Sequence, residues 1–152
     1  MEHLISGNTK MNNTLIDAAT IEKMVDYAKD IASHNQITLD LSKDSISHLA
    51  GLLNLIHDEY TLEEVHNEQS LSGICLSLGI YIGECMRKGL NSPDILWWHG
   101  VPSGGGDATA FLKMGENEVY PIDWVAKQIT MGSSQSVDKK FKVHLKKLKR
   151  IG

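Results

Sequence analysis

Glu84 is the residue whose surroundings in the sequence most suggest chemistry. It interrupts an apolar stretch between Gly83 and Cys85, where an ionised carboxylate must find polar partners once it leaves water. Such a carboxylate can serve as a general acid or base. It can equally be a structural group paired with Arg87, Lys88, a histidine or loop amides, and this structural interpretation is favoured here.

No residue or motif besides Glu84 indicates a particular reaction or cofactor. The sequence lacks a Gly-x-Ser-x-Gly motif, and neither Cys75 nor Cys85 lies in a catalytic context. Most of the histidines lack a partner at i, i+4 with a following carboxylate: His34, His48, His57, His66, His99 and His144. The best local cluster is His57, Asp58 and Glu59, followed by His66 and Glu68, and it is interpreted as solvated helix ends. We expect no enzyme, no metal and no cofactor.

The glycine-rich loop from Ser103 to Asp107 could bring backbone amides close to a phosphate. A phosphate-binding loop, however, needs Lys followed by Ser or Thr at the start of a helix, whereas here Asp107 adds repulsion and a strand pattern follows. The sequence favours a mobile hairpin loop over a nucleotide site, and the role of Ser103 to Gly106 stays open.

Charge is distributed unevenly along the chain. The net charge is −4, but residues 1–138 hold all 19 acidic side chains and only 8 basic ones, which gives −11, whereas the last fourteen residues carry +7. An acidic body suits a cationic partner and repels nucleic acid. The basic end could bind phosphates, fold back onto the acidic body or simply be solvated.

The periodicity predicts one α+β domain over residues 20–152 behind a loose leader, 1–19. The first helix is expected to begin at Thr20 as N-cap, and the second to run from Ser42 as N-cap to about Tyr60. A third helix is expected over 71–88, ended by Gly89, and a fourth over 122–131, between Pro121 and Gly132. The last helix is expected over 137–150. Residues 37–41 are expected as an extended connector or an edge strand, and 61–69 as a lead-in or the start of the next helix. Strands are expected at 95–99, 108–114 and 118–120. The predicted architecture is therefore N-terminal helices packed on a small antiparallel three-stranded sheet, followed by two C-terminal helices.

Small and aromatic residues suggest where these elements pack. Gly73, Gly79 and Gly83 each weaken a helix by about 1 kcal/mol relative to Ala, which indicates that another backbone approaches there. Trp97 and Trp98 must point to opposite faces of a strand, so that one of them is available to a partner.

The cellular compartment is inferred from what the sequence lacks. Its longest apolar stretch, Leu71 to Met86, is too short for a membrane span, and the first thirteen residues do not resemble a signal peptide. Cys75 and Cys85 are too far apart on one helix for a disulfide, which agrees with a reducing cytoplasm.

Several segments together resemble a family of small uncharacterised bacterial domains, the DUF3806-like family. The most specific element is Gly-x-Tyr-x-Gly-Glu, with Gly79, Tyr81, Gly83 and Glu84. The other matching segments are 39–42, Ser45-Ile46 with Leu49, Leu78 ahead of the motif, the tryptophan strand, 120–122, 125–127 and 132–141. The resemblance implies helices against a small sheet and no settled activity, and domains of similar size and acidity occur as immunity proteins beside toxins.

Together these observations predict a cytosolic binding protein, most concretely an immunity protein that covers a toxin with an acidic face. The residues expected to contact the partner are Glu63, Glu64, Glu68, Trp98 and Asp107. The alternative is a nucleic-acid-associated accessory protein that uses the basic end, although the acidic body makes nucleic acid the less favoured partner. The cations of that end are Lys139, Lys140, Lys142, Lys146, Lys147, Lys149 and Arg150.

Overall fold

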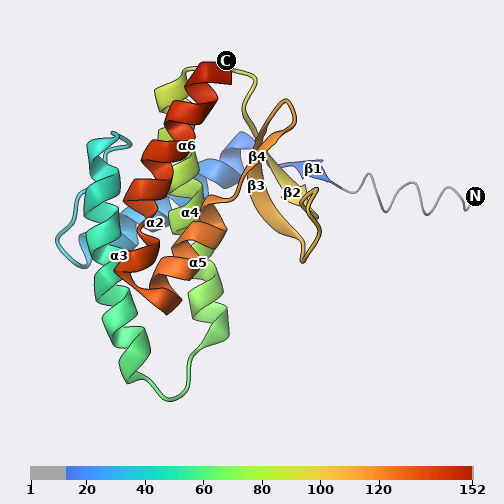
Figure 1. Ribbon diagram of the computed structural model, residues 1–152. Helices are drawn as coiled ribbons and strands as arrows, with labels where there is room; N and C mark the ends of the chain where they lie inside the picture. The colour runs from blue at the N-terminus through green and yellow to red at the C-terminus, as the bar shows by residue number, and fades with distance from the viewer. Residues whose placement is uncertain (1–12, 152) are drawn as a thin grey trace, which may run out of the picture.

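Within residues 13–151, five α-helices and a four-stranded antiparallel sheet make up the fold (Figure 1). The structure is a computed structural model that describes residues 13–151. The elements are β1 (Thr14–Leu15), α2 (Ala18–Ser33), α3 (Asp44–Leu62), α4 (Glu68–Leu90), β2 (Leu96–Gly100), β3 (Thr109–Met114), β4 (Asn117–Val119), α5 (Pro121–Met131), a 3-10 turn (Ser133–Gln135) and α6 (Val137–Ile151). The expected α+β class is confirmed.

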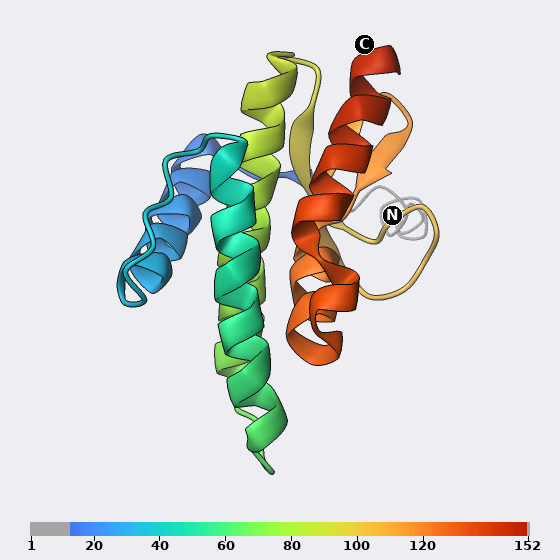
Figure 2. The ribbon, with the colours of Figure 1, turned by 60° about the vertical axis from the view of Figure 1, so that its left-hand side comes forward.

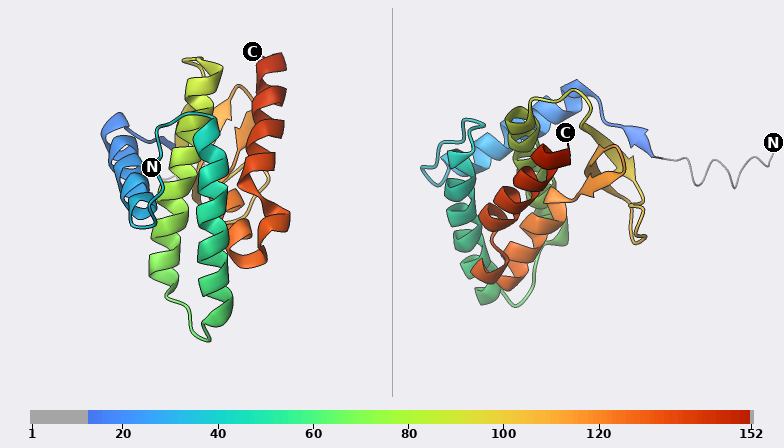
Figure 3. Two further views of the ribbon diagram at one scale, coloured as in Figure 1. Left: turned by 90° about the vertical axis from the view of Figure 1, so that its left-hand side faces the viewer. Right: turned by 45° about the horizontal axis from the view of Figure 1, so that its top comes forward.

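The long helix α4 lies at the centre. Figures 2 and 3 show α2 on one side of the α3–α4 pair and α5 with α6 on the other. The sheet lies beside α4, and its strands follow the order β1-β2-β3-β4. Trp97, Leu112 and Val119 are neighbours across β2, β3 and β4, and all three are buried in the main core. These three residues lie on the face of the sheet that packs on α4.

The sheet has one strand more than the sequence predicted. Thr14 and Leu15 pair with His99 and Trp98, and the Ile16 N–H continues this pairing by donating to the Trp97 carbonyl at 3.0 Å. A two-residue strand is too short to show the alternation by which strands are recognised. The added strand falls in the segment expected as a loose leader, of which residues 1–12 lie outside the described part.

Several helix ends differ from the prediction: α3 follows Lys43 rather than Ser42, and in α2 and α4 a residue two or three positions away forms the cap in place of the expected one. α2 begins two residues before Thr20, since Asp17 is the N-cap and its Oδ1 accepts the Thr20 N–H at 2.7 Å. α4 continues through Gly89 to Leu90 and ends at Asn91, which adopts the left-handed conformation with φ 49°. Asn tolerates this conformation better than most residues other than Gly.

A buried glutamine joins three helices on the side away from the sheet. The Gln128 amide nitrogen donates to the Ala50 carbonyl and to Asn54 Oδ1, both at 3.0 Å. Its oxygen accepts the Val137 N–H at 2.8 Å, so all of these contacts satisfy a fully buried polar group. α3, α5 and the start of α6 are thereby fixed relative to one another.

Within residues 13–151, none of the helices is long and apolar enough to span a bilayer.

Candidate functional site

The Gly-x-Tyr-x-Gly-Glu element lies in the middle of α4, where each residue meets a different neighbour. A Cβ on Gly79 would lie 2.6 Å from the Ile122 Cα, so α5 begins directly against the α4 backbone. A Cβ on Gly83 would overlap the Trp97 indole. The prediction of a close backbone is therefore confirmed at Gly79, whereas a side chain takes that place at Gly83. It is wrong at Gly73, where no neighbour among the described residues, apart from the helix's own backbone, lies within 4 Å of an added Cβ.

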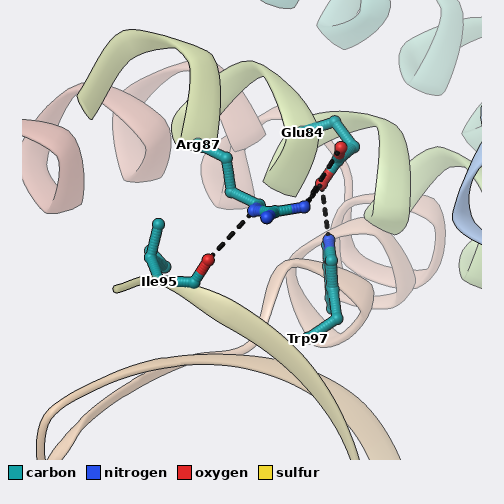
Figure 4. A network of polar contacts seen from close by, with 4 residues as sticks. All are labelled: Glu84, Arg87, Ile95 and Trp97. Atoms are coloured by element: carbon teal, nitrogen blue, oxygen red, sulfur yellow. Dashed lines mark hydrogen bonds and ion pairs between the residues drawn. The ribbon is translucent and has the colours of Figure 1, made fainter. Parts of the chain in front are cut away.

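Glu84 joins α4 to the first residues of β2 (Figure 4). Its Oε2 accepts the Trp97 Nε1–H at 2.7 Å and lies 3.1 Å from Arg87 Nη1. Arg87 in turn donates through Nε to the Ile95 carbonyl at 3.0 Å. Of the alternative partners predicted for Glu84, the structure shows Arg87, whereas no sequence pattern pointed to the indole partner. The Trp97 and Arg87 donors thus satisfy the Glu84 carboxylate, which is only partly buried.

The Glu84 carboxylate is half-buried, with 21% of its side chain exposed. It lines a shallow hollow of about 450 Å³ together with Arg87, Lys88 and Asn91. The carboxylate therefore keeps access to solvent, and its burial alone does not exclude an acid–base role. Both oxygens nevertheless lie within 3.4 Å of Arg87 Nη1, so the contacts made by the carboxylate are those of a structural cluster.

Tyr81 fixes the connection between α2 and α3. Its buried hydroxyl accepts the Leu41 N–H at 2.7 Å and lies 2.7 Å from Ser45 Oγ, which donates to the Ser42 carbonyl at 2.6 Å. Leu41 has φ 65°, a conformation that costs energy for a residue with a side chain. The tyrosine thus holds a strained loop in place.

Both thiols are unsuited to nucleophilic chemistry. Burial raises the pKa of Cys75 from 9.0 to about 11. Burial also raises the pKa of Cys85 to about 11, although hydrogen bonds from Tyr81 and Ser45 act in the opposite direction. Because the thiolate is the nucleophilic form, neither residue reacts readily at neutral pH.

The turn between α3 and α4 forms a protruding end of the helix pair (Figures 1 and 2). Its glutamates make this end negatively charged. Leu62 and Val65 are 84% and 85% exposed there. Exposed glutamates stand beside them in the sequence, and we name the six residues the acidic tip: Glu59, Leu62, Glu63, Glu64, Val65 and Glu68. No Lys or Arg occurs between Lys43 and Arg87. Within the described residues, the four glutamates form no ion pair closer than 4 Å.

Local contacts hold the acidic tip in one conformation. The His66 ring stacks on Tyr60 with centroids 3.8 Å apart and an interplanar angle of 9°, and its Nε2 donates to the Tyr60 carbonyl at 2.8 Å. Asn67 caps α4 by accepting the Ser70 N–H at 3.1 Å. These contacts tie the turn to the ends of α3 and α4 and restrict its rearrangement.

The five residues predicted to contact a partner do not form one surface. Glu63, Glu64 and Glu68 come together at the acidic tip, whereas Trp98 and Asp107 lie on the sheet side, in β2 and in the loop that follows it (Figure 1). Trp97 is buried and Trp98 half-buried, so their predicted opposite orientation is confirmed. The exposed Leu62 and Val65 were not predicted as contacts; the available signal was two apolar residues inside a run of glutamates.

The glycine loop borders a hollow of about 540 Å³ beside the start of α5. Its ionisable lining residues are Asp107, Tyr120 and Asp123, with no Lys or Arg among them. Asp123 pairs with Lys127 at 3.1 Å. This lining disfavours a phosphate and agrees with the interpretation as a hairpin loop.

Neither a metal-binding cluster among the described residues nor a similarity to known proteins indicates a function for this chain. Across residues 13–151, no group of three His, Cys, Asp or Glu side chains is placed to hold a metal ion. No protein-family model, curated protein or solved structure matches this chain, so the resemblance to the DUF3806-like family stays a prediction.

Proposed function

We propose that this protein is a binding protein that grips a cationic protein partner with its acidic tip, as an immunity protein does when it neutralises a toxin. The observation that carries the proposal is the combination of Leu62 and Val65, each more than four-fifths exposed, with four carboxylates beside them that form no ion pair within residues 13–151. Exposed apolar groups rimmed by charge are typical of interaction sites.

The chemistry of the acidic tip suggests how the partner is recognised. The carboxylates attract a basic surface, raising the rate of encounter and excluding acidic competitors. Leu62 and Val65 can then enter an apolar depression, where burial of each side chain contributes about 1.5–3 kcal/mol. A partner that acts on nucleic acid carries basic residues around its active site, which such a protrusion would cover.

The order of the acidic tip favours binding as well. Tyr60, His66 and Asn67 hold the turn by stacking and hydrogen bonds, so that little conformational freedom is lost when a partner is bound. A preorganised surface converts more of its contact energy into affinity.

Affinity capture from the native host with the whole chain tests the proposal. The tip variant carries Glu63→Lys, Glu64→Lys and Glu68→Lys. The matched control carries Glu22→Lys, Asp26→Lys and Asp30→Lys, which replace three carboxylates on α2 and change the net charge equally. We expect the wild-type chain and the control to recover the same basic protein, and the tip variant to lose it.

The contrary result is equally specific. If the control loses the partner to the same extent as the tip variant, recognition depends on net charge rather than on this surface, and the proposal fails. It fails too if all three chains recover no common protein. A neutralised toxin should also stop growth of cells that express it with the tip variant, and should not do so in the presence of the control.

A further inference from the structure

A hollow lined by lysines lies between the start of α3 and the side of α6. Its volume is about 370 Å³, and Phe141 and Leu145 lie at its apolar base. The charged side chains that line it are Lys43, Asp44, Lys142, Lys146 and Lys149. Four lysines against one aspartate leave a net charge of +3 in a concave site built from two elements far apart in the sequence.

The lysines of this hollow lack enough local counterions. Lys142 pairs with Asp138 at 3.2 Å, while its own side chain stays 72% exposed. Among the residues that the structure describes, Lys43, Lys146 and Lys149 form no ion pair within 4 Å. Lys142 and Lys146 are four residues apart and Lys146 and Lys149 three apart, so their like charges face one another along α6 and repel. An anion in the hollow would relieve this repulsion.

We infer that the lysine hollow binds the phosphodiester backbone of a nucleic-acid strand, a function beyond the protein binding proposed for the acidic tip. Lysines bind phosphate groups as mobile point charges, and several that converge on one concave site can surround a protruding phosphate. A bilayer is a poorer fit, because the apolar side of α6 packs into the core and cannot insert. That side consists of Val137, Phe141, Leu145 and Leu148.

The acidic tip does not cancel the positive charge of the hollow. Lys43 precedes the first turn of α3, whereas the acidic tip lies at the other end of this 19-residue helix. That helix is about 28 Å long at 1.5 Å per residue. Charges that far apart are screened, because the Debye length is about 8 Å at physiological salt. Figure 2 shows the two ends of α3 well separated.

Fluorescence anisotropy of a labelled 20-nucleotide single-stranded DNA with the full chain tests the inference. The hollow variant carries Lys142→Gln, Lys146→Gln and Lys149→Gln. The control carries Lys139→Gln, Lys147→Gln and Arg150→Gln, three cations of the same helix that do not line the hollow. We expect the hollow variant to bind at least 10-fold more weakly and the control less than 3-fold. The logarithm of the DNA association constant decreases linearly with the logarithm of salt concentration. The magnitude of this slope should be smaller by about 2 in the hollow variant only, because each lost phosphate contact removes about 0.7 from it.

Lys43→Glu is a second test from the opposite wall of the hollow and covers the case in which the triple variant fails to fold. It should weaken DNA binding at least 5-fold, whereas the tip variant described above should leave DNA binding unchanged. Equal losses in the hollow variant and the control would overturn the inference, as would the absence of binding at 50 mM salt. Tighter binding to vesicles containing 30% phosphatidylserine than to the DNA would overturn it as well.

Discussion

At the scale of single residues, the motif in α4 is explained by what each side chain lets the neighbouring elements do. Gly79 admits the start of α5, Gly83 admits the Trp97 ring, and Glu84 accepts the hydrogen of that ring. Tyr81 holds the strained loop before α3. The four residues thus position four parts of the fold against one helix, and none of them needs a substrate to account for its identity.

The two glycine environments on α4 predict opposite effects of the same substitution. Gly79→Ala should lower the free energy of unfolding by about 1–3 kcal/mol, because the new Cβ collides with the backbone of Ile122. Gly73→Ala should raise it by up to about 1 kcal/mol, because that position is open and alanine favours the helix. Urea unfolding of both variants measures the difference. Equal effects of the same sign would contradict the proposed packing.

The raised pKa values of the two thiols predict a loss of stability in alkaline solution. The folded pKa of Cys85 is raised from 9.0 to about 11, and Cys75 behaves alike. Their contribution is therefore complete below pH 9 and declines as pH rises from about 9 to about 11, because only the unfolded chain then releases the protons. Urea unfolding between pH 8 and pH 11 should show this decline. It should be smaller for the double variant Cys75→Ala and Cys85→Ala, and an identical decline would refute the assignment.

At the scale of the elements, the helices could be located from the sequence because each buries one apolar stripe with helical spacing. In α6, for example, Val137, Phe141, Leu145 and Leu148 are buried as their spacing predicts. One feature that the sequence did not reveal, the strand β1, depends on a tertiary contact. β1 has two residues and no period, and it exists because β2 offers a free edge. The ends of α2 and α4 depend on local capping instead, by Asp17 rather than Thr20 and by Asn91 rather than Gly89.

The acidic tip could be predicted only in part for the same reason. Its negative charge is visible in the sequence, but the exposure of Leu62 and Val65 follows from the way the α3–α4 turn projects beyond the rest of the helices. The sequence does not reveal that the sheet and the acidic tip lie apart, so it could not separate Trp98 from the glutamates.

The acidic tip predicts that binding and stability can be separated. Leu62→Ser and Val65→Ser together should change the free energy of unfolding by less than about 0.5 kcal/mol per site, because both side chains are already exposed. The same change should abolish recovery of the partner, since it removes the apolar anchors and keeps the charge. Thermal unfolding and affinity capture measure the two properties. A large drop in melting temperature would show that these side chains support the fold instead.

At the scale of the whole molecule, the fold places a negatively charged surface and a positively charged surface apart, a separation that the linear sequence indicates only in part. The acidic tip and the lysine hollow lie at opposite ends of α3, and α4 and α6 complete one end each. Such a molecule presents a negative surface and a positive surface without mutual cancellation. Binding at either surface should weaken as salt rises, and charge changes at one should leave the other intact.

The central claim is that the acidic tip contacts a protein partner, and site-specific photo-cross-linking in the native host tests it most directly. A photoreactive amino acid replaces Val65 in one chain and Tyr27, an exposed residue on α2, in another. We predict a discrete covalent adduct from position 65 that disappears with Glu63→Lys, Glu64→Lys and Glu68→Lys, and no adduct from position 27. An adduct from position 27 alone, or none from position 65, would contradict the account.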